Sequence, residues 1–178
     1  VFTLSGILST ACASSILLVE FGLQIWIGSD FAREATSTAR LILVGTYFNG
    51  LAFVPFALLQ AQRRPDVVAK IHAIEIVPFI ILLWTCVTIS GLPGAAFAWS
   101  VRVIVDAALL FKAADYDIRR SLAFVPGATL VLLTWVFTSA ASPRPTLALA
   151  LSAIVVSGMG LWMFVSDASL LRFVRHRR

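Results

Sequence analysis

Residues 94–111 read GAAFAWSVRVIVDAALLF, an apolar run that carries two charged residues, Arg102 and Asp106, one helical turn apart. The run approaches the ~20 residues that a helix needs to cross a bilayer. A charge near the bilayer centre costs about 2.5–3.5 kcal/mol, so a side chain of this kind normally faces protein or water. The stretch therefore predicts a membrane helix whose charges serve either helix packing or a polar function.

The rest of the chain has the same character. Of its 178 residues, 60% are hydrophobic and 13% are charged, and the mean hydropathy is +0.94. Soluble domains are usually about 45–50% apolar and about 25% charged. We expect an all-α, polytopic transmembrane helical bundle, a single domain over residues 1–178, with about six spanning helices. The expected spans lie at about 4–27, 38–59, 71–90, 94–112, 122–140 and 146–166, followed by a basic tail at 167–178.

The chain begins with Val1, and its first residues already belong to a span, so we expect it to be the C-terminal part of something longer. Cys12 and Cys86 lie in apolar segments at depths that differ by about 10 Å, which predicts two inert buried thiols and no disulfide. Metal-ligand spacings and nucleotide-binding glycine loops are absent from the sequence. We therefore expect no cofactor and no enzyme activity.

Basic residues predict the orientation in the membrane. Arg63, Arg64 and Lys70 lie in one connector, further basic residues lie at 112–121, and four arginines lie in the tail. The intervening loops, 28–40, 91–93 and 141–145, carry only Arg33, Arg40 and Arg144. Short cytoplasmic loops are enriched in Lys and Arg, so this pattern places the C-terminus in the cytoplasm. The clusters suit anionic lipid headgroups, and we expect no nucleic-acid partner.

Small residues and turn residues predict how the helices pack. Ser5, Ser9 and Ala13 recur at four-residue spacing, as at helix–helix contacts in membranes. The sequence Gly91-Leu-Pro-Gly94 predicts a tight hairpin between two spans. Gly28 closes the first predicted helix.

Charged residues inside the predicted spans are candidates for function. Arg102 lies about 15 Å from the end of its helix, near the midplane. Asp106 lies on the same face one turn away, and Glu75, in the preceding span, is at a similar depth, so either carboxylate is within reach of Arg102. One interpretation is a structural ion pair between two helices. Another is a polar cavity, with His72 beside Glu75, in which the guanidinium fork binds phosphate oxygens. A third is proton coupling by Glu75 or Asp106.

Two further polar residues are ambiguous. Asn49 is a candidate substrate ligand, although an amide in a span more often makes an interhelical hydrogen bond. Glu20 has three possible environments: the headgroups, a partner helix outside this chain, or the cavity.

Four motifs occur in one order along the chain. They are WIGSDFA at 26–32, ARLILVGTYFNGLAFVP at 39–55, LLQAQRRP at 58–65 leading to AKIHAIEIVP at 69–78, and GLPGAAFAWSVR at 91–102. Together they resemble the bacterial polysaccharide (O-antigen type) flippases of the multidrug/oligosaccharidyl-lipid/polysaccharide exporter superfamily, over about residues 22–112.

The resemblance implies two helical lobes around a central cavity and an alternating-access mechanism, with this chain forming most of the C-terminal lobe. The N-terminal lobe of the same chain would then be its partner. Glu75 and Arg102 fall at motif positions, whereas Asp106 and Glu20 do not match the pattern.

The sequence and the resemblance together predict a flippase of the bacterial cytoplasmic (inner) membrane that moves a polyprenyl-diphosphate-linked oligosaccharide. The expected substrate-binding residues are Arg102, Glu75, Asp106, His72 and Asn49. A drug or cation antiporter of the same superfamily is one alternative, which a midplane arginine disfavours. A scaffold whose charges only pair helices is the other.

Overall fold

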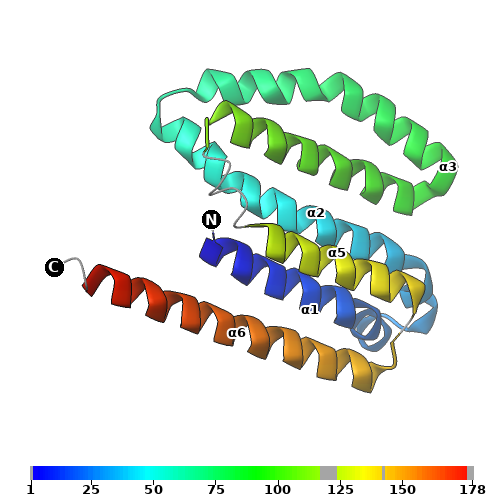
Figure 1. Cartoon of the computed structure of the whole chain (residues 1–178). Coiled ribbons are helices and arrows are strands. Elements are labelled where there is room, and N and C mark those ends of the chain that lie inside the picture. The colour runs from blue at the N-terminus through cyan, green and yellow to red at the C-terminus, as the bar shows by residue number, and fades with distance from the viewer. Residues whose placement is uncertain (1, 117–123, 142, 176–178) are drawn as a thin grey trace.

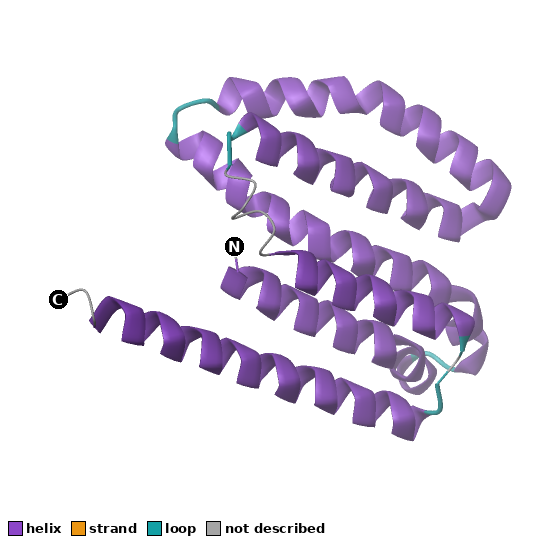
Figure 2. Ribbon diagram, viewed as in Figure 1, coloured by secondary structure: helices purple, strands orange, loops and turns teal. Residues whose placement is uncertain are grey.

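The computed structural model describes residues 2–116, 124–141 and 143–175, with side chains as far as Leu161. Every regular element in this part of the chain is a helix (Figures 1 and 2). These helices are α1 (Phe2–Trp26), α2 (Ser29–Ala61), α3 (Pro65–Ala113), α5 (Val125–Ala140) and α6 (Pro145–Arg175). The all-α prediction is confirmed for the described residues.

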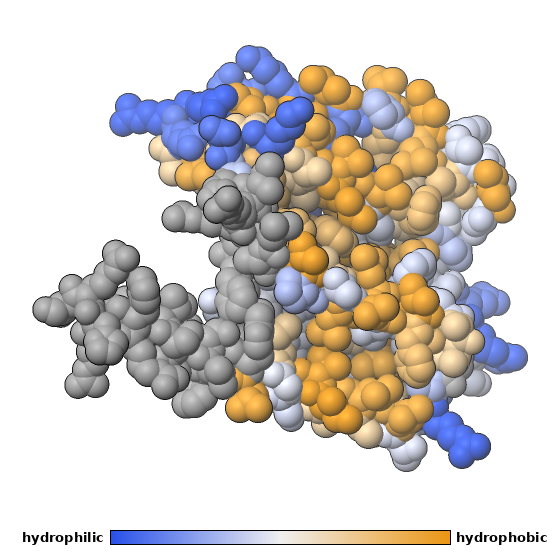
Figure 3. Space-filling model, viewed as in Figure 1, coloured by the Kyte–Doolittle hydropathy of each residue, from blue (hydrophilic) through white to orange (hydrophobic). Residues whose placement is uncertain are grey.

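Three helices, α1, α2 and α3, are long and apolar enough to cross a membrane. Helix α5 and the part of α6 from Pro145 to Leu161 are apolar but shorter. Figure 3 shows apolar side chains over the middle of the visible face, with hydrophilic ones gathered where α2 meets α3 and at the opposite end. The chain is thus a helical membrane protein, while the count of about six spans stays a prediction.

Helix α3 folds back on itself at the predicted hairpin. Gly91 has φ 61° and ψ −134°, a conformation that residues other than glycine rarely adopt. Figure 1 shows the two legs, 65–90 and 92–113, running in opposite directions. A side chain at Gly94 would overlap the backbone carbonyl of Cys86, so glycine at this position lets the legs approach closely.

The helices form a stack in which α2 and α1 are central (Figure 1). The 92–113 leg of α3 packs on α2, where Ser100 Oγ donates a hydrogen bond of 2.8 Å to the carbonyl of Leu41. The 65–90 leg lies outermost and exposes apolar residues such as Ile74 and Trp84. Helix α1 contacts α2, α5 and α6.

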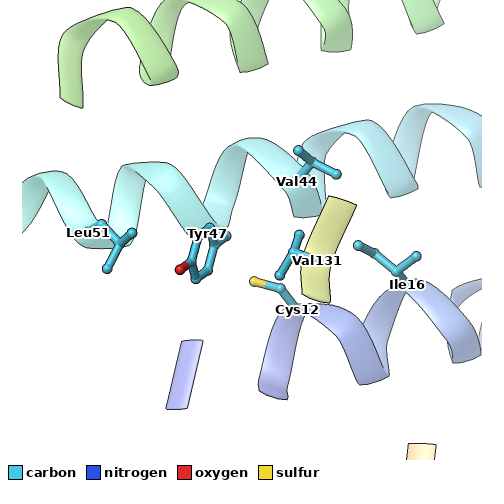
Figure 4. Packing of buried hydrophobic residues seen from close by; sticks show 6 residues of the cluster. All are labelled: Cys12, Ile16, Val44, Tyr47, Leu51 and Val131. Carbon is cyan, nitrogen blue, oxygen red and sulfur yellow. The ribbon is translucent and has the colours of Figure 1, made fainter. Parts of the chain in front are cut away.

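The core between α1, α2 and α5 is shown in Figure 4, with Tyr47 fully buried at its centre. The Tyr47 hydroxyl lies 2.8 Å from Ser5 Oγ and donates to the carbonyl of Phe124 at 2.9 Å. Ser5, Ser9 and Ala13 are all buried, which confirms the predicted packing face of the first helix. Hydroxyl groups that must find partners away from water thus join three helices.

Several boundaries differ from the prediction. The expected loop at 28–40 is helical from Ser29, because α2 begins directly after Gly28 and continues unbroken to Ala61. Helix α6 continues to Arg175, through most of the segment expected as a tail. Both cysteines are free, but Cys86 is only partly buried. Arg119, Arg120, the first residues of the predicted span at 122–140, and residues 176–178 lie outside the described residues.

Candidate functional site

Arg102 lies on the 92–113 leg of α3 and is 34% exposed. Its Nε is 3.7 Å from Oε2 of Glu75 on the other leg, and its Cζ is 5.2 Å from the centroid of the Phe79 ring. A separation of 3.7 Å is too long for a hydrogen bond, so the contact with Glu75 is an ion pair only. The ring face of Phe79 adds a weak cation–π attraction. Of the two carboxylates expected within reach of Arg102, the structure pairs it with Glu75.

Glu75 is buried, with 7% of its side chain exposed. Neither of its carboxylate oxygens has a hydrogen-bond partner among the described residues. A buried carboxylate without hydrogen bonds is costly, and a single distant guanidinium compensates it only in part. The Arg102–Glu75 pair is therefore far from a saturated structural salt bridge.

A second contact joins the same two legs. Nε2 of His72 lies 3.2 Å from Oδ1 of Asp106, and His72 is 42% exposed while Asp106 is 12% exposed. The one-turn spacing made an Arg102–Asp106 pair possible, but the antiparallel legs instead set Asp106 opposite His72. Two acidic and two basic side chains thus form one cluster across the hairpin.

A cavity of about 230 Å³ opens beside this cluster. It is lined by polar and charged residues, Asn49, His72, Arg102 and Asp106, and by two aromatic residues, Phe53 and Phe56. Four of the five predicted substrate-binding residues therefore share one cavity. Glu75 is not in the lining and lies next to Arg102 instead.

Sequence reasoning did not find Phe53 and Phe56. Their rings lie 5.9 Å apart on α2. Their spacing in the sequence could have indicated this position. Residues four and three apart share a helix face, which is the spacing of Asn49, Phe53 and Phe56. In a predicted membrane span, however, phenylalanine is equally typical of a lipid-facing surface.

Arg40 does not lie in a loop, contrary to the prediction from the sequence. It is buried in α2, with 7% of its side chain exposed. Arg40 Nη2 donates to Glu20 Oε2 at 3.0 Å, and Nη1 donates to the carbonyl of Thr138 at 2.8 Å. Glu20 therefore pairs within this chain, and the contacts of Arg40 join α1, α2 and α5.

The chemistry of the two arginines differs. Arg40 has short hydrogen bonds from both terminal nitrogens and is enclosed by helices. Arg102 has one long contact through Nε and borders a cavity. Across residues 2–116, 124–141 and 143–161, no group of three or more His, Cys, Asp or Glu residues is placed to hold a metal ion. The fold and the site together place this protein among helical membrane proteins that have a charged cavity between helices.

Comparison with known proteins narrows this class. No family model matches the chain, and no solved structure matches it. A Shigella flexneri protein named "Putative O-antigen transporter" is 42% identical over 88 residues. That segment is 49% of this chain but only 21% of the relative's length. The match supports an O-antigen-transporter-like relationship and fits a transporter role.

Proposed function

We propose that the chain is part of a flippase that moves a polyprenyl-diphosphate-linked oligosaccharide across the bacterial cytoplasmic membrane by alternating access. In this proposal it forms most of one lobe, with its C-terminus in the cytoplasm, and an N-terminal lobe completes the transport cavity. Arg102 binds the diphosphate, while the lipid tail stays in the bilayer.

The proposal depends above all on the incomplete pairing of Arg102. A guanidinium presents several donors in a planar fork, which matches two phosphate oxygens at once. Here the described contact uses Nε and not the fork. A membrane-embedded cation that has a partial counter-ion and borders a cavity is suited to an anionic ligand.

The neighbouring groups suit the rest of such a substrate. Glu75 holds the guanidinium through a weak contact that a phosphate can replace. Asn49 and His72 offer hydrogen bonds to sugar hydroxyls from two different helices. The relative's name, an O-antigen transporter, agrees with a saccharide substrate.

Substituting Arg102 in the full-length protein tests the proposal. Arg102→Lys keeps the charge but loses the fork, and Arg102→Ala loses both. We expect glycan export to fall by about ten-fold or more in each, as for the loss of a charge-assisted hydrogen bond. Protein levels, measured by immunoblot, should stay near wild type in Arg102→Lys, because the lysine ammonium still compensates the buried Glu75 carboxylate. Wild-type export by both variants would refute the role.

The scaffold alternative predicts a different result for a charge exchange. If Glu75 and Arg102 only join the two legs, the double variant Glu75→Arg/Arg102→Glu should keep both stability and export. If Arg102 binds an anion, the exchange should keep protein levels but abolish export. The antiporter alternative ranks lower because the Arg102 guanidinium beside Glu75 repels a cation.

A further inference from the structure

A second and larger cavity, of about 510 Å³, lies on the opposite side of the contact between α2 and the 92–113 leg. Its walls are apolar and come from three elements: Phe48 and Leu51 on α2, Ile104, Ala108 and Phe111 on α3, and Phe124 at the start of α5. The volume is in the range of ~300–1,000 Å³ that is typical of sites for small organic ligands. None of the residues predicted to bind substrate lines it.

Among the described residues, the polar lining of the cavity lies at one end. Lys112, Asp115 and Tyr116 lie at the C-terminal end of α3, and the wall from there back to Ile104 is apolar over about 12 Å. Lys112 belongs to the basic connector near 112–121, which is predicted to be cytoplasmic like the connector with Arg63 and Arg64. A polar rim at headgroup level above an apolar slot matches the shape of a phospholipid, not that of a soluble metabolite.

Part of the wall is held in place by hydrogen bonds. The carbonyl of Phe124 accepts from the Tyr47 hydroxyl at 2.9 Å, and Tyr47 in turn contacts Ser5. The Phe124 ring stacks on Phe111 with centroids 5.9 Å apart, and Tyr116 meets Phe111 edge-on at 5.5 Å. The aromatic side of the cavity is thus preorganised, which reduces the entropy lost on binding.

The charges at the rim select the headgroup. Lys112 and Asp115 are both exposed, and none of the ion pairs among the described residues joins them to each other. An ammonium attracts a phosphate, and a carboxylate attracts an amine. A purely anionic headgroup would meet repulsion from Asp115, whereas a headgroup with one phosphate and one amine satisfies both residues.

We propose that this cavity binds one phosphatidylethanolamine molecule, with an acyl chain between α2, α3 and α5, the phosphate at Lys112 and the amine at Asp115. The bound lipid would fill the space between the α3 hairpin and α5. The inference does not depend on the transport function or on Arg102, so either can fail without the other.

Native mass spectrometry of the full-length protein in detergent tests the proposal. The protein is supplied with equimolar phosphatidylethanolamine and phosphatidylglycerol, and the retained lipids are counted. Wild type should retain phosphatidylethanolamine in preference to phosphatidylglycerol. Ala108→Phe places a phenylalanine ring in the cavity from an exposed position. It should reduce this retention about ten-fold or more, because the displaced acyl chain loses apolar contact equal to that of about one buried side chain.

The chain offers a matched control for the slot. A groove of similar volume between α1 and α2 is lined by Ser14, Leu18 and Ala39 and has no charged residue in its lining. Ala39→Phe should therefore leave phosphatidylethanolamine retention unchanged. An equal loss in both variants, or no loss in Ala108→Phe, would overturn the proposed site.

Two rim variants test the headgroup and are exposed enough to leave folding intact. Lys112→Gln should lower retention of both lipids, and Asp115→Asn should remove the preference for phosphatidylethanolamine over phosphatidylglycerol. Equal retention of the two lipids by wild type would refute the headgroup assignment. A preference for phosphatidylglycerol, or co-purification of a polyprenyl lipid in the slot, would refute it as well.

Discussion

Arg40 and Arg102 are arginines within apolar helices, and their surroundings differ sharply. Arg40 bonds Glu20 and the carbonyl of Thr138 and is almost fully enclosed. Arg102 makes one ion pair at 3.7 Å and stays one-third exposed beside a cavity. The number of short hydrogen bonds therefore distinguishes Arg40, a structural residue, from Arg102, a candidate substrate-binding residue.

Arg40→Ala should destabilise the bundle by about 2–3 kcal/mol, the contribution expected of hydrogen bonds to a charged group. Its loss also leaves the carbonyl of Thr138 without this donor. Arg33→Ala is the matched control, because the Arg33–Asp30 pair is exposed and such pairs contribute little. Thermal unfolding in detergent measures both variants. Equal melting temperatures for the two would contradict the structural role of Arg40.

Among the helices, α3 has the least conventional conformation. Its two legs bring Glu75 and His72 opposite Arg102 and Asp106, and only the reversal at Gly91 makes these contacts possible. The close approach of the legs depends on Gly94, which faces the carbonyl of Cys86. The hairpin is therefore the element that builds the charged cluster.

Gly91→Ala should destabilise the protein by about 1–3 kcal/mol, because alanine is strained at φ 61° and ψ −134°. Gly94→Ala should separate the legs and so disturb the Arg102–Glu75 contact as well. Gly158→Ala in α6 is the control, since a side chain there meets only open space and alanine favours the helix. Gly91→Ala and Gly94→Ala should therefore lower the unfolding midpoint and glycan export, whereas Gly158→Ala should leave both near wild type. Export at wild-type level in Gly94→Ala would argue against the hairpin geometry.

On the face of the molecule that Figure 3 shows, hydrophilic residues lie at two ends with apolar residues between them. The C-terminal end of α6 lies at the same end of the bundle as the turn between α2 and α3 (Figure 1). The turn between α1 and α2, at residues 27–28, lies at the opposite end (Figure 1). This arrangement agrees with alternating crossings, and the basic connector then predicts which end is cytoplasmic.

Thiol labelling in intact cells tests that orientation. Cys12→Ala and Cys86→Ala remove the native thiols, and Ser29→Cys or Gln62→Cys then adds one exposed thiol at either end. A membrane-impermeant reagent should label Ser29→Cys in whole cells and Gln62→Cys only after lysis. The reverse pattern would place the C-terminus outside.

Features that depend on neighbouring residues were predictable from the sequence. Hydropathy indicated a helical membrane protein, and Gly91-Leu-Pro-Gly94 indicated the hairpin, because turn chemistry is local. The hairpin in turn made Glu75 a reachable partner for Arg102. The predicted start of the second helix was wrong, because the polar residues before Arg40 resemble a loop although they form the first turns of α2.

Contacts between distant segments were decided by the tertiary structure alone. The rotation of each helix about its axis set Arg40 against Glu20 and Asp106 against His72, and it turned Phe53 toward the charged cavity. The apolar cavity of about 510 Å³ likewise lies where α2, α3 and the start of α5 meet around Phe124. Such rotations follow from close packing of many side chains at once, and the periodicity of a single uniformly apolar helix contains too little information to specify them.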